Sequence, residues 1–174
     1  TRSFHVTGVQ TCALPIYFPN GYDVLLDAVK QHKQNTLGRF FDALLIPFYV
    51  FRLPASVYKK VGLFDERFGV GGGEDVDYRL RTLFAGISVK YTESSYILHF
   101  RGKSTWDGTE TITDIDFRNS AYENEFITKW GMDLSNLCLS RGDVKSVIGK
   151  YQLQGLANEG KFSEIIKRVY GQVS

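Results

Sequence analysis

The sequence predicts an α/β layered fold, in which a mixed sheet is flanked by helices and a helical tail follows at the C-terminus. Apolar segments typical of strands alternate with amphipathic segments typical of helices along the chain. The length of 174 residues, with 43% hydrophobic and 14% aromatic residues, fits one packed domain. Few strands are recognisable, so we expect the sheet to be incomplete.

The first predicted elements are separated by glycine and proline. Apolar residues recur at helical spacing over residues 24–32, before a break at Gly38, and predict a helix. Residues 44–53 predict a buried strand with a bend at Pro47. A short helix is expected over residues 55–61.

Helix and strand signals alternate again further along the chain. Residues 74–85 predict an amphipathic helix, and residues 87–91 and 95–100 predict two strands. A polar loop is expected from residue 101 to residue 113, and a helix over residues 117–129. The remaining tail, residues 143–169, predicts two helices on either side of Gly160.

The first sixteen residues differ from the rest in their origin. The run VTGVQTCALPI, from Val6 to Ile16, resembles the conceptual translation of a common DNA sequencing adapter. We therefore expect residues 1–16 to be a non-native segment, with native sequence beginning at Tyr17. The alternative is a native strand over residues 4–9. We divide the remaining chain into a domain portion, residues 17–140, and a helical extension, residues 141–174.

Composition excludes several classes of function. The formal net charge is +2 with basic residues spread along the chain, so we expect no nucleic-acid partner. No apolar run approaches the roughly 20 residues that cross a bilayer, and we expect a cytoplasmic protein without a transmembrane segment. Only Cys12 and Cys138 are present, which excludes a disulfide framework and a cysteine metal site.

One glycine-rich segment brings acids to a predicted helix start. The run GGGEDVDYRLR places Glu74, Asp75 and Asp77 behind three glycines. Carboxylates at a helix N-terminus can simply cap the helix or offset its dipole. Glycines, however, also allow a ligand to approach the backbone closely. The pattern leaves both interpretations open, and the spacing of Asp75 and Arg79 would allow an ion pair that holds the carboxylate ionised.

An ordered set of motifs, spread over about eighty residues from Phe51 to Trp130, resembles family 2 glycosyltransferases of the GT-A fold. The motifs are VYKKVGLFDERFGVGGGEDVDYRLR, then SYILHFRGKST, then ENEFITKWG. The resemblance implies an incomplete GT-A-like (Rossmann-like) fold that comprises the C-terminal, acceptor-side portion. The family's nucleotide-binding half and its aspartate pair have no counterpart here. We therefore expect this chain to be inactive alone, although its parent protein should be active.

The resemblance implies roles for individual residues. Asp75 matches the general base of the family's Glu-Asp motif. Glu74, with Gly72 and Gly73, would bind the acceptor, whereas Asp77 would be structural. His99 matches a ligand of the Mn²⁺ or Mg²⁺ ion that holds the donor diphosphate. The donor diphosphate itself would contact three residues of the loop that follows: Arg101, Lys103 and Ser104.

The implied activity is that of a hexosyltransferase-type enzyme. It transfers a sugar, with inversion, from a nucleotide-diphosphate sugar to a hydroxyl of a carbohydrate or other acceptor. The alternative is a non-catalytic carbohydrate-binding or scaffold module derived from the same fold. A metal-dependent hydrolase that uses the acids and His99 is a weaker third hypothesis, because their spacing fits no hydrolytic motif.

Overall fold

The computed structural model of the protein describes residues 3–7, 22–44, 48, 50–69, 72–95 and 111–173. These residues form eight α-helices, one 3-10 helix (η1) and three short strands. The elements in chain order are β1 (Ser3–Thr7), α1 (Tyr22–Thr36), β2 (Phe40–Phe41), α2 (Ala55–Val61), η1 (Glu66–Phe68), α3 (Glu74–Phe84), β3 (Ser88–Thr92), α4 (Ile112–Trp130), α5 (Met132–Cys138), α6 (Val144–Lys150), α7 (Gln154–Asn158) and α8 (Phe162–Val173).

The prediction of a layered α/β fold is wrong for the described residues, which are mostly helical. The strands have only five, two and five residues. They are joined in the order β1–β3–β2, with β1 parallel and β2 antiparallel to β3. So few strand residues cannot form a layer with helices on both faces.

The main reason for this error is the apolar segment after β2. Residues 44–53 were expected to be a strand, yet their described members, 44, 48 and 50–53, form none. Their side chains pack instead: Leu44 contacts the main core, whereas Phe48 and Phe51 contact the core of β3. A short apolar run does not by itself distinguish a strand from an irregular buried segment.

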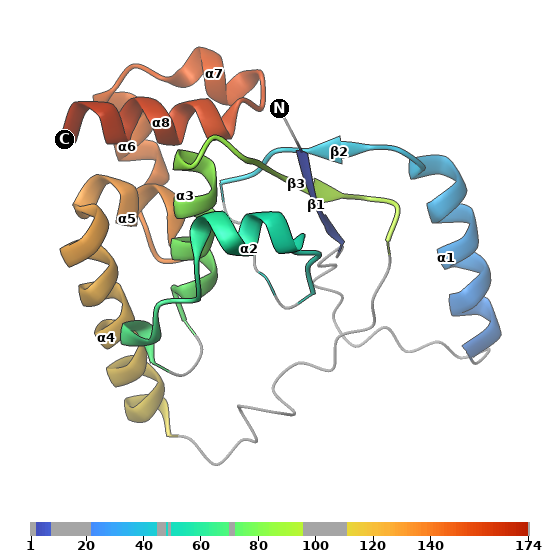
Figure 1. Ribbon diagram of the computed structural model, residues 1–174, viewed down its shortest axis with the longest axis horizontal. Helices are drawn as coiled ribbons and strands as arrows, with labels where there is room; N and C mark the ends of the chain where they lie inside the picture. The colour runs from blue at the N-terminus through green and yellow to red at the C-terminus, as the bar shows by residue number, and fades with distance from the viewer. Residues whose placement is uncertain are drawn as a thin grey trace.

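Most of the buried side chains belong to α3 and to the helices after it. Figure 1 shows α4 to α8 gathered beside α3, with α1 on the opposite side of the sheet. Phe126, Leu134 and Ile165, from three of these helices, are fully buried in this core. Their sequence separation means that the tail folds onto α3 rather than trailing from it.

The helices expected over residues 24–32 and 117–129 are found with longer bounds as α1 and α4, whereas α5 was not predicted. α4 begins at Ile112, where the side chain of Thr111 caps it in a capping box with Asp114. The tail contains α6, α7 and α8 in place of two helices, and Gly160 separates the last two with a φ of 66°. None of the described helices has the length and apolar character of a membrane-spanning helix.

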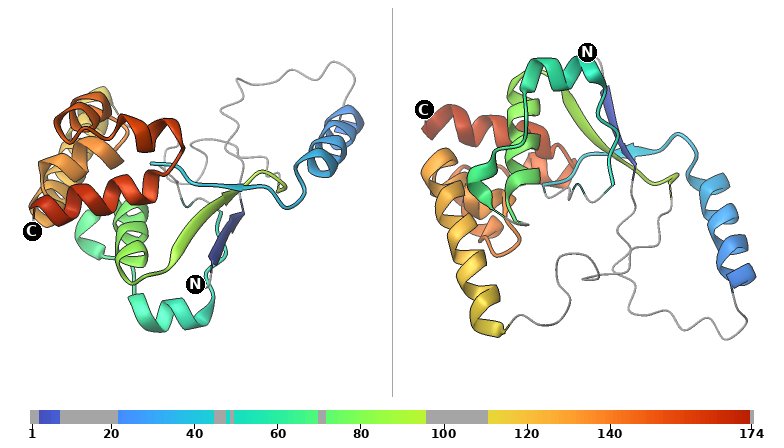
Figure 2. Two further views of the ribbon diagram at one scale, coloured as in Figure 1. Left: turned by 90° about the horizontal axis from the view of Figure 1, so that it is seen from above. Right: turned by 60° about the horizontal axis from the view of Figure 1, so that its bottom comes forward.

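Helix α1 stands apart from the other helices in all three ribbon views (Figure 1, Figure 2). Its C-terminal end is attached to the residue that follows β3. His32 Nε2 lies 2.8 Å from the carbonyl oxygen of Glu93, and the Thr36 hydroxyl lies 3.1 Å from the same oxygen. The candidate functional residues described below lie in α3 and its neighbours, away from α1.

Candidate functional site

The acids singled out in the sequence occupy the first turn of α3, directly after the glycine-rich loop. Gly73 precedes the helix with a φ of 81°, in the left-handed region that glycine adopts at little cost. It has no side chain with which to cap the helix. Glu74, Asp75 and Asp77 all lie in the first turn, where the helix dipole favours negative charge.

Glu74 turns back onto the loop that precedes it. Its Oε2 accepts a hydrogen bond from the main-chain N–H of Gly72, with a distance of 2.6 Å. This bond fixes the loop against the start of the helix. The side chain is half-buried, and its Oε1 atom is not engaged in this bond.

Gly72 has a packing reason to be glycine. A Cβ atom at this position would lie 2.3 Å and 2.5 Å from two ring atoms of Tyr122, which are distances that real Cβ atoms do not show. At Gly73, a Cβ atom would lie 3.1 Å from Phe68 and 3.3 Å from Tyr122. The close approach that these glycines allow is therefore made by aromatic rings of the protein itself.

Asp75 is a half-buried carboxylate held by main-chain N–H groups. Its Oδ2 accepts from Phe48 N at 3.2 Å, and its Oδ1 accepts from Val76 N at 2.7 Å. Burial raises the pKa of Asp75 above its ordinary value, the nearby Glu74 charge raises it further, and the two N–H donors oppose the rise. Asp75 is thus a stronger proton acceptor than a solvated aspartate.

Arg79 does not form the ion pair with Asp75 that their spacing would allow. It extends toward the segment after β2, where its guanidinium donates to the carbonyl oxygens of Ala43 and Leu44 and lies 3.3 Å from Asp42 Oδ1. Arg79 is fully buried, and burial lowers its pKa. The sequence spacing could not reveal this competing partner, because Asp42 precedes Arg79 by 37 residues.

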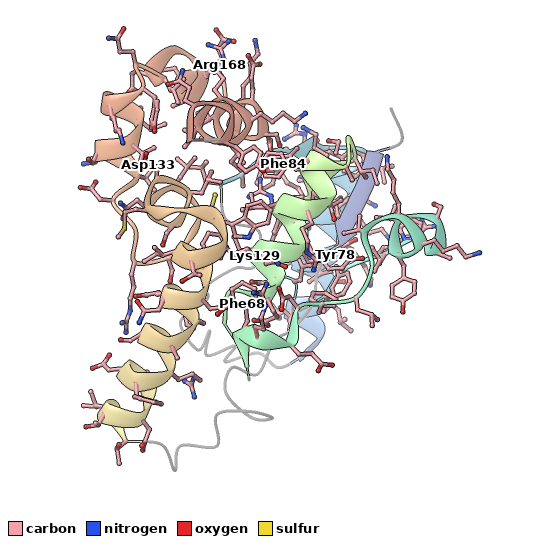
Figure 3. All side chains as sticks on the ribbon, turned by 60° about the vertical axis from the view of Figure 1, so that its left-hand side comes forward. Phe68, Tyr78, Phe84, Lys129, Asp133 and Arg168 are labelled. Atoms are coloured by element: carbon pink, nitrogen blue, oxygen red, sulfur yellow. The ribbon has the colours of Figure 1, made fainter. Side chains whose placement is uncertain are left out.

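Asp77 faces α4 and is fully buried. Its carboxylate accepts from Trp130 Nε1 at 2.9 Å and from Arg81 Nε at 2.8 Å, and it lies 2.7 Å from Lys129 Nζ. Figure 3 shows Lys129 reaching into the space between α4 and α3, close to Phe68. With its charge met by protein donors, Asp77 joins the two helices.

Aromatic rings cluster beside Asp75. Phe48, whose N–H binds Asp75, lies 5.1 Å from Phe51 and 6.4 Å from Tyr78 between ring centroids. Phe64 stacks on Tyr78 at 4.5 Å. A small, mainly apolar depression opens in this region, between the segment before α2, α3 and β3; its lining residues are Phe48, Phe51, Arg52, Leu53, Tyr78, Thr82 and Val89.

The donor-side residues predicted from the sequence cannot be placed. His99, Arg101, Lys103 and Ser104 all lie outside the described residues. Within the part of the chain that is described, no group of three or more His, Cys, Asp or Glu side chains could hold a metal ion. The described residues therefore supply no set of ligands for the Mn²⁺ or Mg²⁺ ion that the resemblance implies.

Comparisons of the chain with protein-family models, with curated proteins and with solved structures find no match.

The described site thus contains one half-buried acid whose carboxyl has a raised pKa, one carboxylate that ties down the adjacent loop, and one that is engaged in the interior. Three contacts that shape it could not be read from the sequence: the Phe48 N–H on Asp75, the Tyr122 ring on Gly72, and the Asp42 pair of Arg79. Each joins residues that lie far apart in the chain. Chemically, the arrangement can accept a proton from a polar ligand that reaches Asp75.

Proposed function

We propose that this chain is the acceptor-side part of an inverting glycosyltransferase, which transfers a sugar from a nucleotide-diphosphate donor to an acceptor hydroxyl. The observation that carries the proposal is the environment of Asp75. Burial raises the pKa of this carboxyl, while two main-chain N–H donors hold its oxygens and part of the side chain stays accessible. The sequence motifs around Asp75 support the proposal as well, because their order resembles that in family 2 glycosyltransferases.

Asp75 acts as the general base in this proposal. An acceptor hydroxyl is a poor nucleophile at neutral pH, so a carboxylate must accept its proton as the new glycosidic bond forms. A base works best when its pKa lies near the working pH, and the raised pKa of Asp75 moves it in that direction. The carboxylate leaves the reaction protonated and passes the proton to water.

Glu74 binds the acceptor in this proposal, and the glycine-rich loop supports Glu74. Glu74 fixes the loop through Gly72 N, and its Oε1 remains to accept a hydrogen bond from a second acceptor hydroxyl. The aromatic rings near Phe48 offer an apolar surface beside the base, of the kind on which sugar rings stack.

In this proposal the nucleotide-sugar donor binds only in the full-length parent protein. His99, Arg101, Lys103 and Ser104 would meet the diphosphate there, with Mn²⁺ or Mg²⁺ supplying charge to the leaving group. The proposed site of action is the cytoplasm.

The test compares Asp75→Asn, Glu74→Gln and Asp27→Asn in the full-length protein encoded by the natural gene. Asp27 lies on α1 with a side chain 70% exposed, and its replacement makes the same chemical change away from the site. Sugar transfer from a panel of nucleotide sugars is measured beside donor binding. Asp75→Asn should lower kcat by about 10²–10⁴-fold with donor affinity retained. Glu74→Gln should mainly raise the acceptor KM, and Asp27→Asn should leave both unchanged.

The outcome separates the two functions that the sequence leaves open. A folded full-length protein that binds saccharides but transfers no sugar, whichever acid is replaced, would be the carbohydrate-binding module. Near-normal turnover of Asp75→Asn in an active enzyme would remove Asp75 from the role of base.

A further inference from the structure

Five side chains form a polar cluster between α3, α4 and the loop before η1, which we name the Lys129 cluster: Asp65, Asp77, Arg81, Lys129 and Trp130. Lys129 Nζ lies 2.6 Å from Asp65 Oδ2 and 2.7 Å from Asp77 Oδ1. A single ammonium group thus joins two carboxylates that come from different parts of the chain.

The Lys129 cluster is well shielded from water. The side chain of Asp77 is fully buried, and those of Asp65 and Lys129 are only 16% and 21% exposed. The Lys129 ammonium also lies 5.7 Å from the ring centroids of Phe68 and Trp130. Without the ammonium, Asp65 would keep its pair with Arg67 and Asp77 its pair with Arg81, but the two carboxylates would lose the cation that lies between them.

The cluster fixes the turn of α3 that carries Asp75. Asp75 and Asp77 are two residues apart in one helical turn, so their side chains point to different sides of α3. On one side, Asp75 accepts from Phe48 N. On the other side, Asp77 is anchored to α4, and Tyr122 of α4 packs against Gly72 just before the helix. α4 therefore determines where this turn can lie.

We propose that Lys129 is a positioning residue for Asp75, acting through Asp77 and the first turn of α3. This inference rests on the proposed function of Asp75 as the base. Lys129 does not touch the acceptor; it holds the helical turn in the place where the Asp75 carboxylate meets Phe48 N and remains partly shielded from water.

Other charged and titratable groups act on Asp75 directly. They are Glu74 beside it, Arg79 one turn further along α3, and Tyr122 from α4. None of them belongs to the Lys129 cluster. A change at Lys129 should therefore reach Asp75 through the position of α3, and the amide signals of the first turn should move with the carboxyl.

The experiment uses Lys129→Met, Lys129→Arg and a matched control, Lys150→Met. Lys150 Nζ also lies 2.7 Å from a carboxylate, Asp133 Oδ2, but on α6 (Figure 3 labels Asp133 and Lys129 in separate regions). The carboxyl ¹³C signal of Asp75 and the amide signal of Val76 are titrated with pH in the 174-residue chain. kcat and acceptor KM are measured in the full-length protein.

Lys129→Met should let water reach the Asp75 carboxyl, so its titration midpoint falls toward the ordinary value of aspartate and the Val76 amide shifts. In the full-length enzyme, kcat should fall by about 10²-fold with KM little changed, because the base is misplaced while the acceptor still binds. Lys129→Arg should recover most of both properties, and Lys150→Met should alter neither.

The proposal is overturned if Lys129→Met lowers only the unfolding temperature and leaves the titration of Asp75 and kcat unchanged. If Lys129→Met does not fold, Lys129→Gln replaces it, since that change also removes the ammonium charge on Asp77 but keeps a polar side chain that can donate a hydrogen bond. An unmoved Asp75 titration in that variant would also overturn the proposal. Absence of sugar transfer by the wild-type full-length protein would refute the proposed function instead, and the NMR titration distinguishes the two failures.

Discussion

Glu74, Asp75 and Asp77 share one helical turn but meet three different environments. Glu74 binds the main chain of the loop, Asp75 lies half-buried against main-chain N–H groups, and Asp77 is engaged by cationic and indole donors in the interior. These differences in environment, rather than in residue type, give the three acids separate chemistry.

The stability of the protein should depend on pH through Asp75. Its folded-state pKa is raised above the ordinary 3.8, so over the interval between these values the folded chain binds more protons than the unfolded chain. The free energy of unfolding that this carboxyl contributes must therefore fall as pH rises through that interval. Asp75→Asn cannot ionise and escapes this fall. Relative to wild type, the variant should gain stability as pH rises above about 3.8 toward the raised folded-state pKa.

Urea unfolding at a series of pH values, with Asp27→Asn as the control, measures this difference. Asp75→Asn also loses one hydrogen-bond acceptor. This loss changes the free energy of unfolding by the same amount at every pH, so it does not account for a difference in pH dependence. Parallel pH profiles for wild type and Asp75→Asn would show that the carboxyl has no raised pKa.

Gly72→Ala should destabilise the protein, because its Cβ would overlap the Tyr122 ring. Overpacking of this kind costs about 1–3 kcal/mol. Gly149→Ala in α6 is the matched control, since a Cβ there meets nothing within 4 Å, and it should be neutral or slightly stabilising. Thermal unfolding of both variants measures the effect. Equal stability of the two would mean that Tyr122 does not cover Gly72.

At the scale of elements, α3 is held on several sides by residues from distant segments. The Lys129 cluster joins it to α4, and Arg79 joins it to Asp42 just after β2. Asp42 also binds α8 near its start, since its carboxylate accepts from Ser163 N at 2.5 Å and from the Ser163 hydroxyl at 2.9 Å. One buried carboxylate thus connects the exit of β2, the middle of α3 and the beginning of α8.

Asp42→Ala should therefore be strongly destabilising. It leaves the buried Arg79 guanidinium without its counter-charge and removes the acceptor at the start of α8. Breaking a buried ion pair on one side costs about 3–5 kcal/mol. Glu164→Ala is the control, because its ion pair with Arg168 on α8 is exposed and worth about 1 kcal/mol or less. Denaturant unfolding of both variants measures the contrast, and similar losses in the two would contradict it.

At the scale of the whole molecule, the core belongs chiefly to α3 and the C-terminal helices, while β1 lies at one edge of the small sheet. β1 pairs with β3 in parallel, from Ser3 beside Ser88 to Thr7 beside Thr92. This strand falls in the segment that we expect to be non-native. The pairing provides backbone hydrogen bonds to β3, which any strand-forming segment could make because these bonds use main-chain groups.

Deletion of residues 1–16 tests that origin. We expect the thermal unfolding midpoint to stay unchanged within error, because the helical core that unfolds cooperatively is formed by other residues. Replacement of the same residues by an unrelated polar sequence of equal length is the control for chain length. A marked loss of stability in both variants would show that β1 is a native strand.

Strong local signals in the sequence were sufficient to predict several elements. The helix expected over residues 55–61 is confirmed as α2, and the helix and strand expected over residues 74–85 and 87–91 are found within one residue as α3 and β3. Glycines just after these helices mark their ends, because the positive φ at Gly62 and Gly86 turns the chain out of the helix. The sequence also predicted that acidic residues occupy the first turn of α3.

The partners of those residues and the fold class depend on tertiary packing, which local sequence patterns do not specify. The segment over residues 44–53 has the composition of a strand, but packing against α3 and β3 gave its described part an irregular path. Asp42 meets Ser163 across 121 residues of sequence. Arg79 pairs with Asp42 and not with Asp75. Local periodicity fixes which face of a helix is apolar, whereas the choice of partner depends on which distant groups folding brings within hydrogen-bond distance.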